Sequence, residues 1–344
     1  MKNNYSSTTL QSLSEELGIS VSTVSRVLNG KAKKFRISQK TEEKVQNTAK
    51  KLGYTPNQIA RGLRLQKTYT IGYVIPDIAN PFFASIAQSI ERSARKLKYS
   101  VLVSDTEENT EIESQTLKLF SERKVDGLII SPVGQYYEHI NDIIKKNVPV
   151  VLIDRYFADT KIPFVTSDNY QGAFSAVSHM INNGHEKIAC IQGLSNTMPN
   201  IERVRGYQEA LKKNKLDVID ELIVGDSFGE ANGYIETKIL LKKKERPTAI
   251  FAVSNLISLG ALRALNEENL RVPEDMSLIS FDDQPYSNFL ATPMTSVAQQ
   301  SSEIGFVATK LLIDIIESKR EFEPNGIFLP TKLIIRKSVK NIKQ

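Results

Sequence analysis

The first part of the chain has apolar residues at helical spacing. Leu10, Leu13 and Leu17 recur at positions i, i+3 and i+7, which predicts a helix with one buried stripe. Gly18 follows this stripe and ends the helix, and Ser20 is a suitable N-cap for a second helix. The pattern therefore predicts two short helices joined by a tight turn.

The second helix, which Ser20 caps, presents a polar face. Val24, Val27 and Leu28 face the first helix. The outward positions are Ser22, Ser25, Arg26 and Asn29. Such a face is typical of a helix-turn-helix in the DNA major groove, where Arg can pair with guanine. An ordinary helical hairpin with a solvated face has the same spacing, so spacing alone leaves both interpretations open.

A third helix is predicted after Ser38. Its apolar positions can close a small three-helix core: Thr41, Val45, Ala49 and Leu52. Residues 56–68 follow, with helix-compatible residues over a stretch shorter than the roughly 12–15 that an isolated helix needs. Gly62 weakens it further, so we expect a helix that is ordered only on contact. A plain linker and a hinge that folds on DNA both agree with this sequence.

From residue 69 onward, short apolar runs alternate with amphipathic stretches. Strand-like runs include YTIGYVIPD, VDGLIISP and VPVVLIDR, and later KIACIQG, PTAIFAVS and MSLISFDD. Continuous apolar strands that alternate with helices predict parallel sheets covered on both faces. We therefore expect an α/β protein with two lobes of doubly wound parallel sheet and a small all-α helix-turn-helix domain at its N-terminus.

Polar residues end most of the strand-like runs. They are Asp77, Asp105, Ser131, Asp154, Asp226, Ser254 and Asp282. Open parallel sheets bind ligands at the carboxyl ends of their strands, so these groups are expected at a cleft between two lobes. Plain turns also end in polar residues. With the rings of Phe82, Phe83 and Phe228, carboxylates and amides suit a small polyhydroxylated ligand or a nucleobase.

Charge favours the DNA interpretation of the first helices. The chain has 344 residues with 40% hydrophobic content, enough for two or three domains. Residues 1–67 hold thirteen Lys or Arg and four Asp or Glu, a net charge of +9, whereas the remainder carries −3. A local basic excess that includes the run KAKKFR, Lys31 to Arg36, is the electrostatic footprint of a phosphate-binding module.

Several classes of protein and site find no support in the sequence. No apolar run of signal-peptide or membrane type is present, so we expect a cytoplasmic location and no membrane partner. Cys190 lies in an apolar run and is expected to be a buried hydrophobe. The histidines, His139, His179 and His185, lack metal-site spacing, so no metal or other cofactor is expected. Phosphate loops, nucleophile elbows and dinucleotide fingerprints are missing, so we expect no enzyme.

Eleven motifs, in order along the chain, carry a resemblance to a known family. They include GISVSTVSRVLNG, KKLGYTPNQIARGLR, IGYVIPDIANPFF, ERVRGYQEAL and LRVPEDMSLISFDD. Over nearly its full length the chain resembles the LacI/GalR (lactose/galactose repressor) family of bacterial transcription regulators. The resemblance implies a periplasmic-binding-protein-like core fused to a DNA-binding head, and a homodimer that binds a pseudo-palindromic operator.

The resemblance also implies which residues contact DNA. The recognition helix corresponds to residues 21–28, with Val21, Ser22 and Arg26 at base-reading positions and Asn29 near phosphate. Leu63 matches the hinge leucine that wedges into the minor groove. The expected DNA-binding set is Val21, Ser22, Thr23, Arg26, Asn29, Asn57, Leu63 and Arg64. The loop GKAKKFRI after the recognition helix is longer than is usual in the family, and extra phosphate contacts are conceivable there.

An effector site between the lobes is implied in the same way. Its positions correspond to Phe82, Phe83, Asp154, Arg203, Phe228 and Asp282, with Arg155, Ser254, Asn255 and Gln299 as neighbours. Where the family usually has Asn-Asp-x-x-Ala, this chain has Ser-Asn-Leu-Ile-Ser at 254–258. We expect a repressor whose operator affinity is controlled by a sugar or sugar derivative. Control by a phosphorylated carrier protein is the main alternative, and a plain sugar-binding protein is a lesser one.

The expected domains follow from these patterns. The helix-turn-helix head covers 1–55, the hinge helix and linker 56–68, and the effector-binding core 69–344. Within the core, the first lobe is expected at about 69–166 plus 298–325, and the second at about 167–297 plus 326–344. The tail after Arg336 has no heptad pattern, which favours a dimer over a tetramer.

Overall fold

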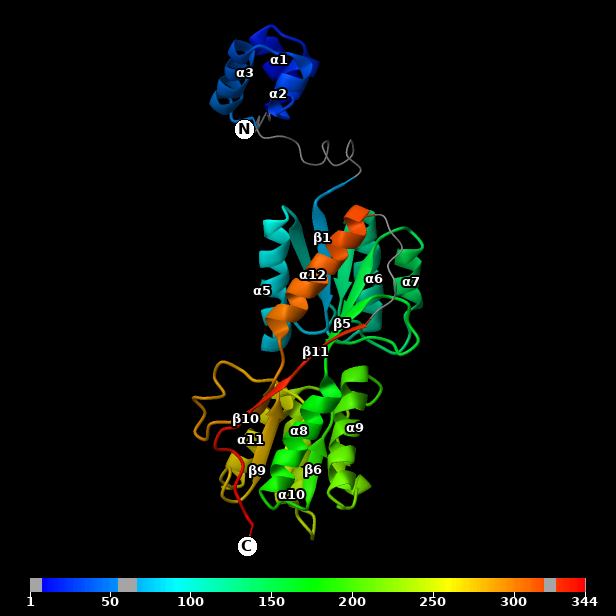
Figure 1. The fold of residues 1–344 in the computed structure, drawn as a ribbon, viewed down its shortest axis with the longest axis vertical. Helices are drawn as coiled ribbons and strands as arrows, with labels where there is room; N and C mark the ends of the chain where they lie inside the picture. Colours follow the sequence, from blue (N-terminus) through cyan, green and yellow to red (C-terminus); the bar gives the residue numbers. More distant parts are fainter. Residues whose placement is uncertain (1–7, 55–66, 319–325, 344) are drawn as a thin grey trace, which may run out of the picture. The chain divides into compact units, whose positions relative to one another are not determined.

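The computed structural model describes residues 8–54, 67–318 and 326–343. The chain divides into two compact units, Met1–Thr68 and Tyr69–Gln344 (Figure 1). In the described residues, no helix is long and apolar enough to cross a membrane. The hinge predicted at 56–68 falls almost entirely outside the described residues.

Over its described residues, 8–54 and 67–68, the first unit is a bundle of three helices. They are α1 (Leu10–Leu17), α2 (Val21–Leu28) and α3 (Gln39–Lys51), with a short 3-10 turn, η1 (Lys33–Phe35), before α3. Leucine, valine and alanine side chains from the three helices pack into one core. The three predicted helices are therefore confirmed, and Val45 and Ala49 join the core as expected. Leu52 does not: it follows the last turn of α3 and is 39% exposed, and Thr41 is only partly buried.

Local signals in the sequence explain where these helices begin and end. Gly18 has a φ of 64°, a left-handed conformation that glycine adopts without strain, and it ends α1. The Ser20 hydroxyl accepts a hydrogen bond of 3.2 Å from the Thr23 backbone N–H and caps α2. Ser38 caps α3 in the same way through Thr41.

The second unit contains two lobes, each built on a six-stranded sheet. The first sheet has the order β11-β5-β4-β3-β1-β2. Its strands are β1 (Thr70–Ile75), β2 (Ser100–Asp105), β3 (Gly127–Ile130), β4 (Val150–Ile153), β5 (Phe164–Ser167) and β11 (Gly326–Leu329), all paired in parallel. Its helices are α5 (Pro81–Lys96), α6 (Thr110–Glu122), α7 (Glu138–Ile144) and α12 (Ser301–Ser318).

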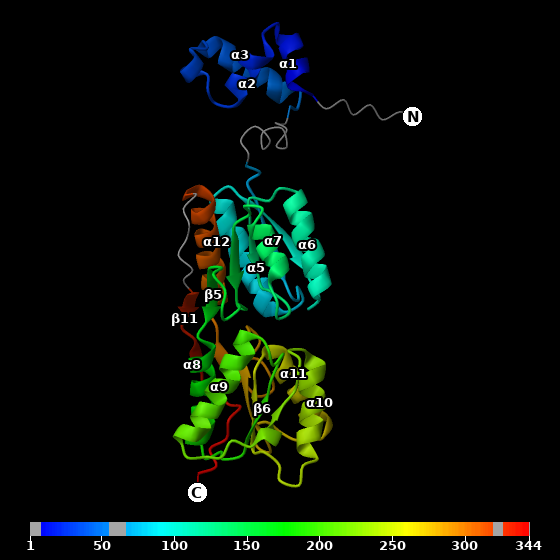
Figure 2. The same ribbon diagram turned by 90° about the vertical axis from the view of Figure 1, so that its right-hand side faces the viewer.

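Both faces of the first sheet are covered, which explains its continuous apolar runs. Along β1, Ile71 and Tyr73 pack with α5 and α12, whereas Val74 packs on the opposite face with α6 and α7. Successive side chains of a strand alternate between faces, so a strand covered on both sides needs apolar residues throughout. Figure 2 shows α12 and α6 on opposite sides of this lobe.

The second sheet has the order β12-β10-β9-β8-β6-β7. Its strands are β6 (Ile188–Ile191), β7 (Ile223–Val224), β8 (Ala249–Ala252), β9 (Ser277–Phe281), β10 (Thr295–Ala298) and the antiparallel edge strand β12 (Lys332–Ile334). The helices are α8 (Asn169–Asn182), α9 (Met198–Lys213), α10 (Glu230–Leu241) and α11 (Asn255–Glu267), with a 3-10 turn η2 (Asp220–Leu222). α8 packs against α9, and α10 against α11.

One predicted lobe boundary is wrong. Residues 326–344 were expected in the second lobe, but β11 pairs in parallel with β5 at the edge of the first sheet. The chain crosses to the second lobe only after Leu329, and earlier crossings follow Ser167 and Ala298. The apolar run that forms β11 can complete either sheet, so its pattern does not indicate which edge it joins.

The cysteine and two of the histidines are packed or hydrogen-bonded within the fold. Cys190 is fully buried in β6, and burial raises the pKa of its thiol. His185 is buried between Thr248 and the Lys340 carbonyl, with ring nitrogens 2.9 Å and 3.1 Å from the two oxygens. His139 Nε2 lies 2.6 Å from the buried carboxylate of Glu113. No group of three metal-ligating side chains occurs in the part of the chain that the structure describes.

Candidate effector pocket and DNA-binding face

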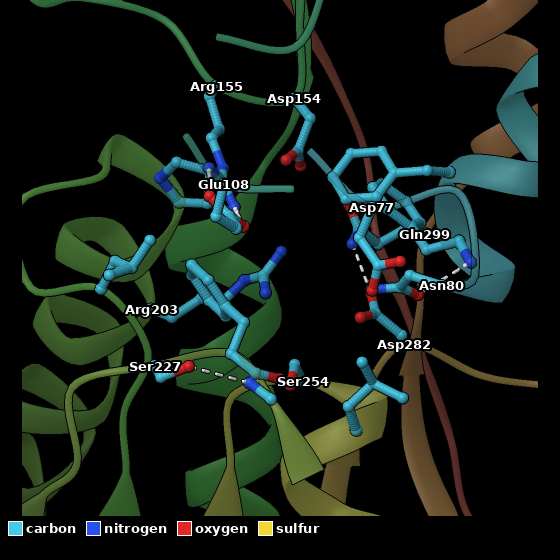
Figure 3. Close-up of a pocket in the computed structure, with 17 residues that line it drawn as sticks. Asp77, Asn80, Glu108, Asp154, Arg155, Arg203, Ser227, Ser254, Asp282 and Gln299 are labelled. Atoms are coloured by element: carbon cyan, nitrogen blue, oxygen red, sulfur yellow. Dashed lines mark hydrogen bonds and ion pairs between the residues drawn. The ribbon is translucent and has the colours of Figure 1, made fainter. Parts of the chain in front are cut away.

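A cavity of about 210 Å³ lies between the two lobes of the core (Figure 3). Nine of the ten predicted effector residues line it: Phe82, Phe83, Asp154, Arg155, Arg203, Phe228, Ser254, Asp282 and Gln299. The cavity therefore brings together side chains as far apart in the sequence as Phe82 and Gln299, as expected where the carboxyl ends of parallel strands face each other.

Two aspartates of this pocket have an unusual backbone conformation. Asp154 follows β4 with a φ of 59°, and Asp282 follows β9 with a φ of 73°. A residue other than glycine in the left-handed region costs on the order of 1–3 kcal/mol, although aspartate tolerates it better than most residues. Both carboxylates are buried at the edges of a shared cavity, so the strained backbone occurs where a ligand would bind.

The Asp154 carboxyl is placed in a poorly solvated position. Its Oδ1 is buried and has no hydrogen-bond partner among the described residues. Burial raises the pKa of Asp154 to about 6, and the neighbouring charges of Arg203 and Arg155 only partly oppose this. Asp282 behaves similarly, since burial raises its pKa while Arg203 and a hydrogen bond from Gln299 Nε2 lower it. Both groups can accept hydrogen bonds from a bound hydroxyl.

Arg203 is held firmly from behind. Its Nε donates to Asn169 Oδ1 at 2.8 Å, its Nη1 donates to the Val253 carbonyl at 2.6 Å, and its Cζ lies 3.8 Å from the centre of the Phe281 ring. Burial lowers the pKa of Arg203, opposed by the charges of Asp282 and Asp154. A guanidinium has five N–H donors, so these contacts leave others for a ligand.

Arg155 is already paired with a carboxylate that sequence reasoning missed. Its Nη1 and Nη2 donate to the two carboxylate oxygens of Glu108 at 2.7 Å and 2.5 Å. Burial lowers the pKa of Arg155, but the hydrogen bonds and charge of Glu108 outweigh this and the net shift is upward. The Arg155 guanidinium also lies over the Phe228 ring, with Cζ 5.4 Å from the ring centre. Arg155 thereby contacts both lobes.

Three phenyl rings supply the apolar part of the pocket. Phe82 and Phe83 lie in the first turn of α5 with ring centres 5.2 Å apart. Phe228 packs against the backbone of Gly193, where an added Cβ would lie 2.3 Å from the ring. A glycine is therefore needed at 193 for Phe228 to occupy this position.

Asn255 is the one predicted effector residue that does not line the cavity. It is buried behind it, where its Nδ2 donates to Asn80 Oδ1 at 3.3 Å. Its neighbour Ser254 caps α11, accepting from the Ile257 N–H at 3.2 Å, and donates to the Phe228 carbonyl at 3.1 Å. Where this chain departs from the usual family motif, Ser254 therefore caps a helix at the pocket and Asn255 makes a contact between the lobes.

Several lining residues were not predicted as effector contacts. They are Asp77, Asn80, Glu108, Leu194, Pro199, Ser227, Gly229 and Leu256. Asp77 follows a strand-like run and Asn80 precedes Pro81 at a helix start, so the sequence indicated that both lie at the ends of elements that face the cleft. Glu108 lies in a polar loop where nothing in the sequence distinguishes it from neighbouring acids.

Three of the predicted strand-end polar residues do not line the cavity: Asp105, Ser131 and Asp226; nor does Asp283, the residue after Asp282. Asp105 instead accepts a hydrogen bond from the Glu107 N–H of its own loop, as in an ordinary turn, and another from the Ile78 N–H in the loop after β1. Asp283 holds Arg336, which donates from Nη1 and Nη2 at 2.6 Å and 3.1 Å. Polar strand ends therefore include both pocket and structural groups.

The outer face of α2 carries the predicted DNA contacts of the head. Ser22, Arg26 and Asn29 are exposed, and Val21 and Thr23 are partly exposed. Asn29 Nδ2 donates to the Ser25 carbonyl at 2.6 Å. The other predicted contacts, Asn57, Leu63 and Arg64, lie outside the described residues.

Comparisons with known proteins agree with both parts of this arrangement. Residues 9–57 match the family described as bacterial regulatory proteins of the lacI family, and residues 177–339 match a periplasmic binding protein-like domain. The chain is also 35% identical over 333 residues to catabolite control protein A of Priestia megaterium, covering 96% of this chain and 99% of that protein. The chain belongs to the LacI family.

Solved structures of the LacI family extend the similarity to the fold. The lac repressor dimer, bound to operator and the anti-inducer ONPF, covers 97% of this chain and 99% of its own at 27% identity, with a TM-score of 0.85. A LacI family regulator from Enterococcus faecium with bound ribose covers 80% of this chain and all of its own at 28% identity, with a TM-score of 0.71. As a LacI family member, the chain is a DNA-binding transcriptional regulator with a periplasmic-binding-protein-like core.

Proposed function

We propose that this regulator changes its operator affinity when a small neutral sugar binds between the core lobes. The observation that carries the proposal is the cavity itself, where buried carboxylates at Asp154 and Asp282 lie near the rings of Phe82, Phe83 and Phe228. Carboxylates accept hydrogen bonds from hydroxyl groups, and the rings suit the apolar face of a sugar. The function of the pocket is therefore binding, and we propose no catalytic role for it.

The charge of the pocket favours a neutral sugar over a sugar phosphate. Its lining includes four carboxylic acids, Asp77, Glu108, Asp154 and Asp282, against two guanidinium groups. One of the guanidinium groups, that of Arg155, is already taken by the bidentate pair with Glu108. A phosphate would meet more acidic than basic groups, and burying an unpaired charge is costly.

The size of the pocket favours a monosaccharide. A volume of about 210 Å³ is smaller than the range of roughly 300–1,000 Å³ typical of sites for drug-sized ligands. The Enterococcus faecium regulator, a relative with the same fold, holds ribose. A pentose or hexose is therefore the class of effector that we propose.

For the DNA-binding part we propose that the exposed face of α2 reads the operator. Arg26 would pair with guanine, Val21, Ser22 and Thr23 would contact base edges, and Asn29 would lie near phosphate. Asn57, Leu63 and Arg64 are proposed as hinge contacts, with Leu63 in the minor groove. We further propose a head domain at 1–55, a hinge at 56–68 and a core at 69–344. We also propose that the protein is a homodimer, as the operator-bound lac repressor is, and that it is cytoplasmic.

Thermal-shift screening of the purified protein tests the effector class. Pentoses, hexoses, the matching sugar phosphates and disaccharides are added in turn, and DNA affinity is then measured with and without each sugar that raises the melting temperature. A neutral monosaccharide that stabilises the core and changes DNA affinity supports the proposal. Stabilisation by sugar phosphates alone would overturn it, as would a response only to a phosphorylated carrier protein.

A further inference from the structure

An exposed aromatic ring lies against the proposed base-reading arginine. The Cζ atom of Arg26 in α2 lies 4.1 Å from the centre of the Phe35 ring, which belongs to η1 and is 43% exposed. We propose that Phe35 is a positioning residue for operator reading, which holds the Arg26 guanidinium by its face and sets its direction in the major groove. This inference rests on the proposed role of Arg26.

The turn that carries Phe35 is fixed to the helix that carries Arg26. Ala32 is buried in the core of the head, and its carbonyl accepts from the Ile37 N–H at 3.0 Å. The Lys31 N–H donates to the Arg26 carbonyl at 2.9 Å, and the Phe35 N–H donates to the Lys31 carbonyl at 3.2 Å. The ring is therefore held in place relative to α2 by backbone hydrogen bonds and a buried anchor.

The geometry of a guanidinium explains why this contact aids base reading. Its five N–H donors lie in one plane, whereas an aromatic ring attracts it through the face of that plane. A face-to-face arrangement, which agrees with the 4.1 Å between Cζ and the ring centre, leaves the N–H edge available for the O6 and N7 acceptors of guanine. It also restricts a long flexible side chain before DNA binds, which lowers the ordering cost of binding.

The charges around Phe35 favour this role over that of an apolar contact for a protein partner. The four basic residues of the same loop, Lys31, Lys33, Lys34 and Arg36, are all exposed. Such a loop attracts phosphate, so the surface that includes the Phe35 ring is expected to face nucleic acid. Phe35 therefore contacts the arginine proposed to read bases and belongs to a loop whose cations are suited to the DNA backbone.

The test uses full-length protein and a duplex that the wild-type protein selects from a random library. Affinity is measured for this duplex and for a shuffled duplex of equal composition, over a range of salt concentrations. An exposed cation–π contact changes affinity by roughly two- to fivefold, so Phe35→Leu and Phe35→Ala should lower the selected-to-shuffled ratio by this factor. The salt slope should stay unchanged, and Phe35→Tyr, which keeps the ring, should behave as wild type.

Lys34→Ala is the matched control in the same turn. Loss of a cation should weaken binding to both duplexes and reduce the salt slope by at most about 0.9, with the ratio unchanged. If Phe35→Leu and Phe35→Ala weaken both duplexes equally, or leave the ratio unchanged, the positioning role is wrong. Thermal unfolding of each variant shows whether the head remains folded. If Phe35→Ala unfolds the head, the result for Phe35→Leu, which keeps apolar bulk, is used instead.

A double-mutant cycle separates the inference from the proposed function on which it rests. In an Arg26→Ala background, Phe35→Ala should cause no further loss of discrimination, because the ring acts through the arginine. A further loss would show that Phe35 contacts DNA by itself and would overturn the inference. If Arg26→Ala alone leaves the selected-to-shuffled ratio unchanged, both the inference and the proposed base reading by α2 are wrong. If Arg26→Ala lowers the ratio but Phe35→Leu does not, only the inference is wrong.

Discussion

Asn255 Nδ2 of α11 donates a hydrogen bond of 3.3 Å to Asn80 Oδ1, which belongs to the other lobe. The same Asn80 oxygen accepts from the Phe82 N–H at 3.1 Å and thereby caps α5. The helix cap that positions two pocket phenyl rings is therefore also a point of contact between the lobes. We therefore expect the hydrogen bond between Asn255 and Asn80 to couple effector binding to the separation of the two lobes.

Replacing Asn255 should therefore weaken effector binding although its side chain does not line the cavity. Asn255→Ala removes a buried hydrogen bond worth about 0.5–1.5 kcal/mol, so affinity for the monosaccharide should fall roughly two- to twelvefold. Calorimetry with the sugar found by thermal shift measures this. Asn266→Ala, at an exposed position of the same helix, is the control and should bind as wild type. Equal affinity in both variants would contradict the coupling.

Arg203→Ala should abolish the effector response while the protein without effector still binds DNA. Hydrogen bonds to a charged group contribute about 1.5–3 kcal/mol, so effector affinity should fall at least tenfold. Arg203→Lys keeps the charge but loses the planar fork, and should also bind weakly. Arg205→Ala serves as control, because Arg205 lies two residues along the same helix, is exposed, and pairs with Glu202. Unchanged calorimetric affinity in Arg203→Ala would remove Arg203 from the site.

The raised pKa of Asp154 predicts a pH dependence of core stability. The unfolded chain releases this proton near pH 4, whereas the folded core keeps it up to about pH 6. In this window the folded state binds more protons, so the contribution of Asp154 to the free energy of unfolding falls as pH rises and levels off above it. Urea unfolding of wild type and Asp154→Asn should show a stability difference, wild type minus variant, that decreases between about pH 4 and 6.

Asp283→Asn is the control for this pH series. Burial raises the pKa of Asp283, but hydrogen bonds from Arg336 and Ser296 outweigh it and the net shift is downward. Its stabilising contribution is therefore fully present above pH 4 and is lost only at lower pH. The wild-type minus Asp283→Asn difference should be constant over the window. A constant difference for Asp154→Asn as well would show that Asp154 is ionised throughout.

DNA binding should depend steeply on salt. Each phosphate that the basic head neutralises adds about 0.9 to the slope of log affinity against log salt concentration. Arg26→Ala should reduce discrimination between selected and random DNA by about 1–3 kcal/mol, the typical value of a bidentate base contact. Fluorescence anisotropy on both duplexes measures these quantities. Equal weakening on both duplexes would assign Arg26 to the phosphate backbone instead.

The sequence was most informative about the head, where structure depends on local signals. Ser20 and Gly18 act through hydrogen bonds and φ angles within a few residues, so the end of α1 and the start of α2 could be predicted from them. The alternation of β1 between two packed faces likewise follows from a local repeat. Such features need no knowledge of distant parts of the chain.

The pocket and the lobe boundaries depend on long-range contacts, and there prediction was weaker. Strand-end position indicates that Asp154 and Asp282 face a cleft, but Asp283, one residue further along, binds Arg336 instead. The partner of Arg155 is Glu108, one of several acids in its loop, and only the folded chain distinguishes it. The lobe of β11 was predicted wrongly for the same reason, because the sequence of an edge strand does not indicate which sheet it pairs with.

The three crossings between the lobes have a consequence for how the protein folds during synthesis. The first sheet lacks its edge strand β11 until residue 329 has been made, by which time nearly all of the second lobe already exists. Domains usually fold in the order in which they leave the ribosome, but here the earlier lobe must wait for the later one. Its unpaired β5 edge is exposed in the meantime, and a nascent chain paused before residue 326 would present that edge to other strands.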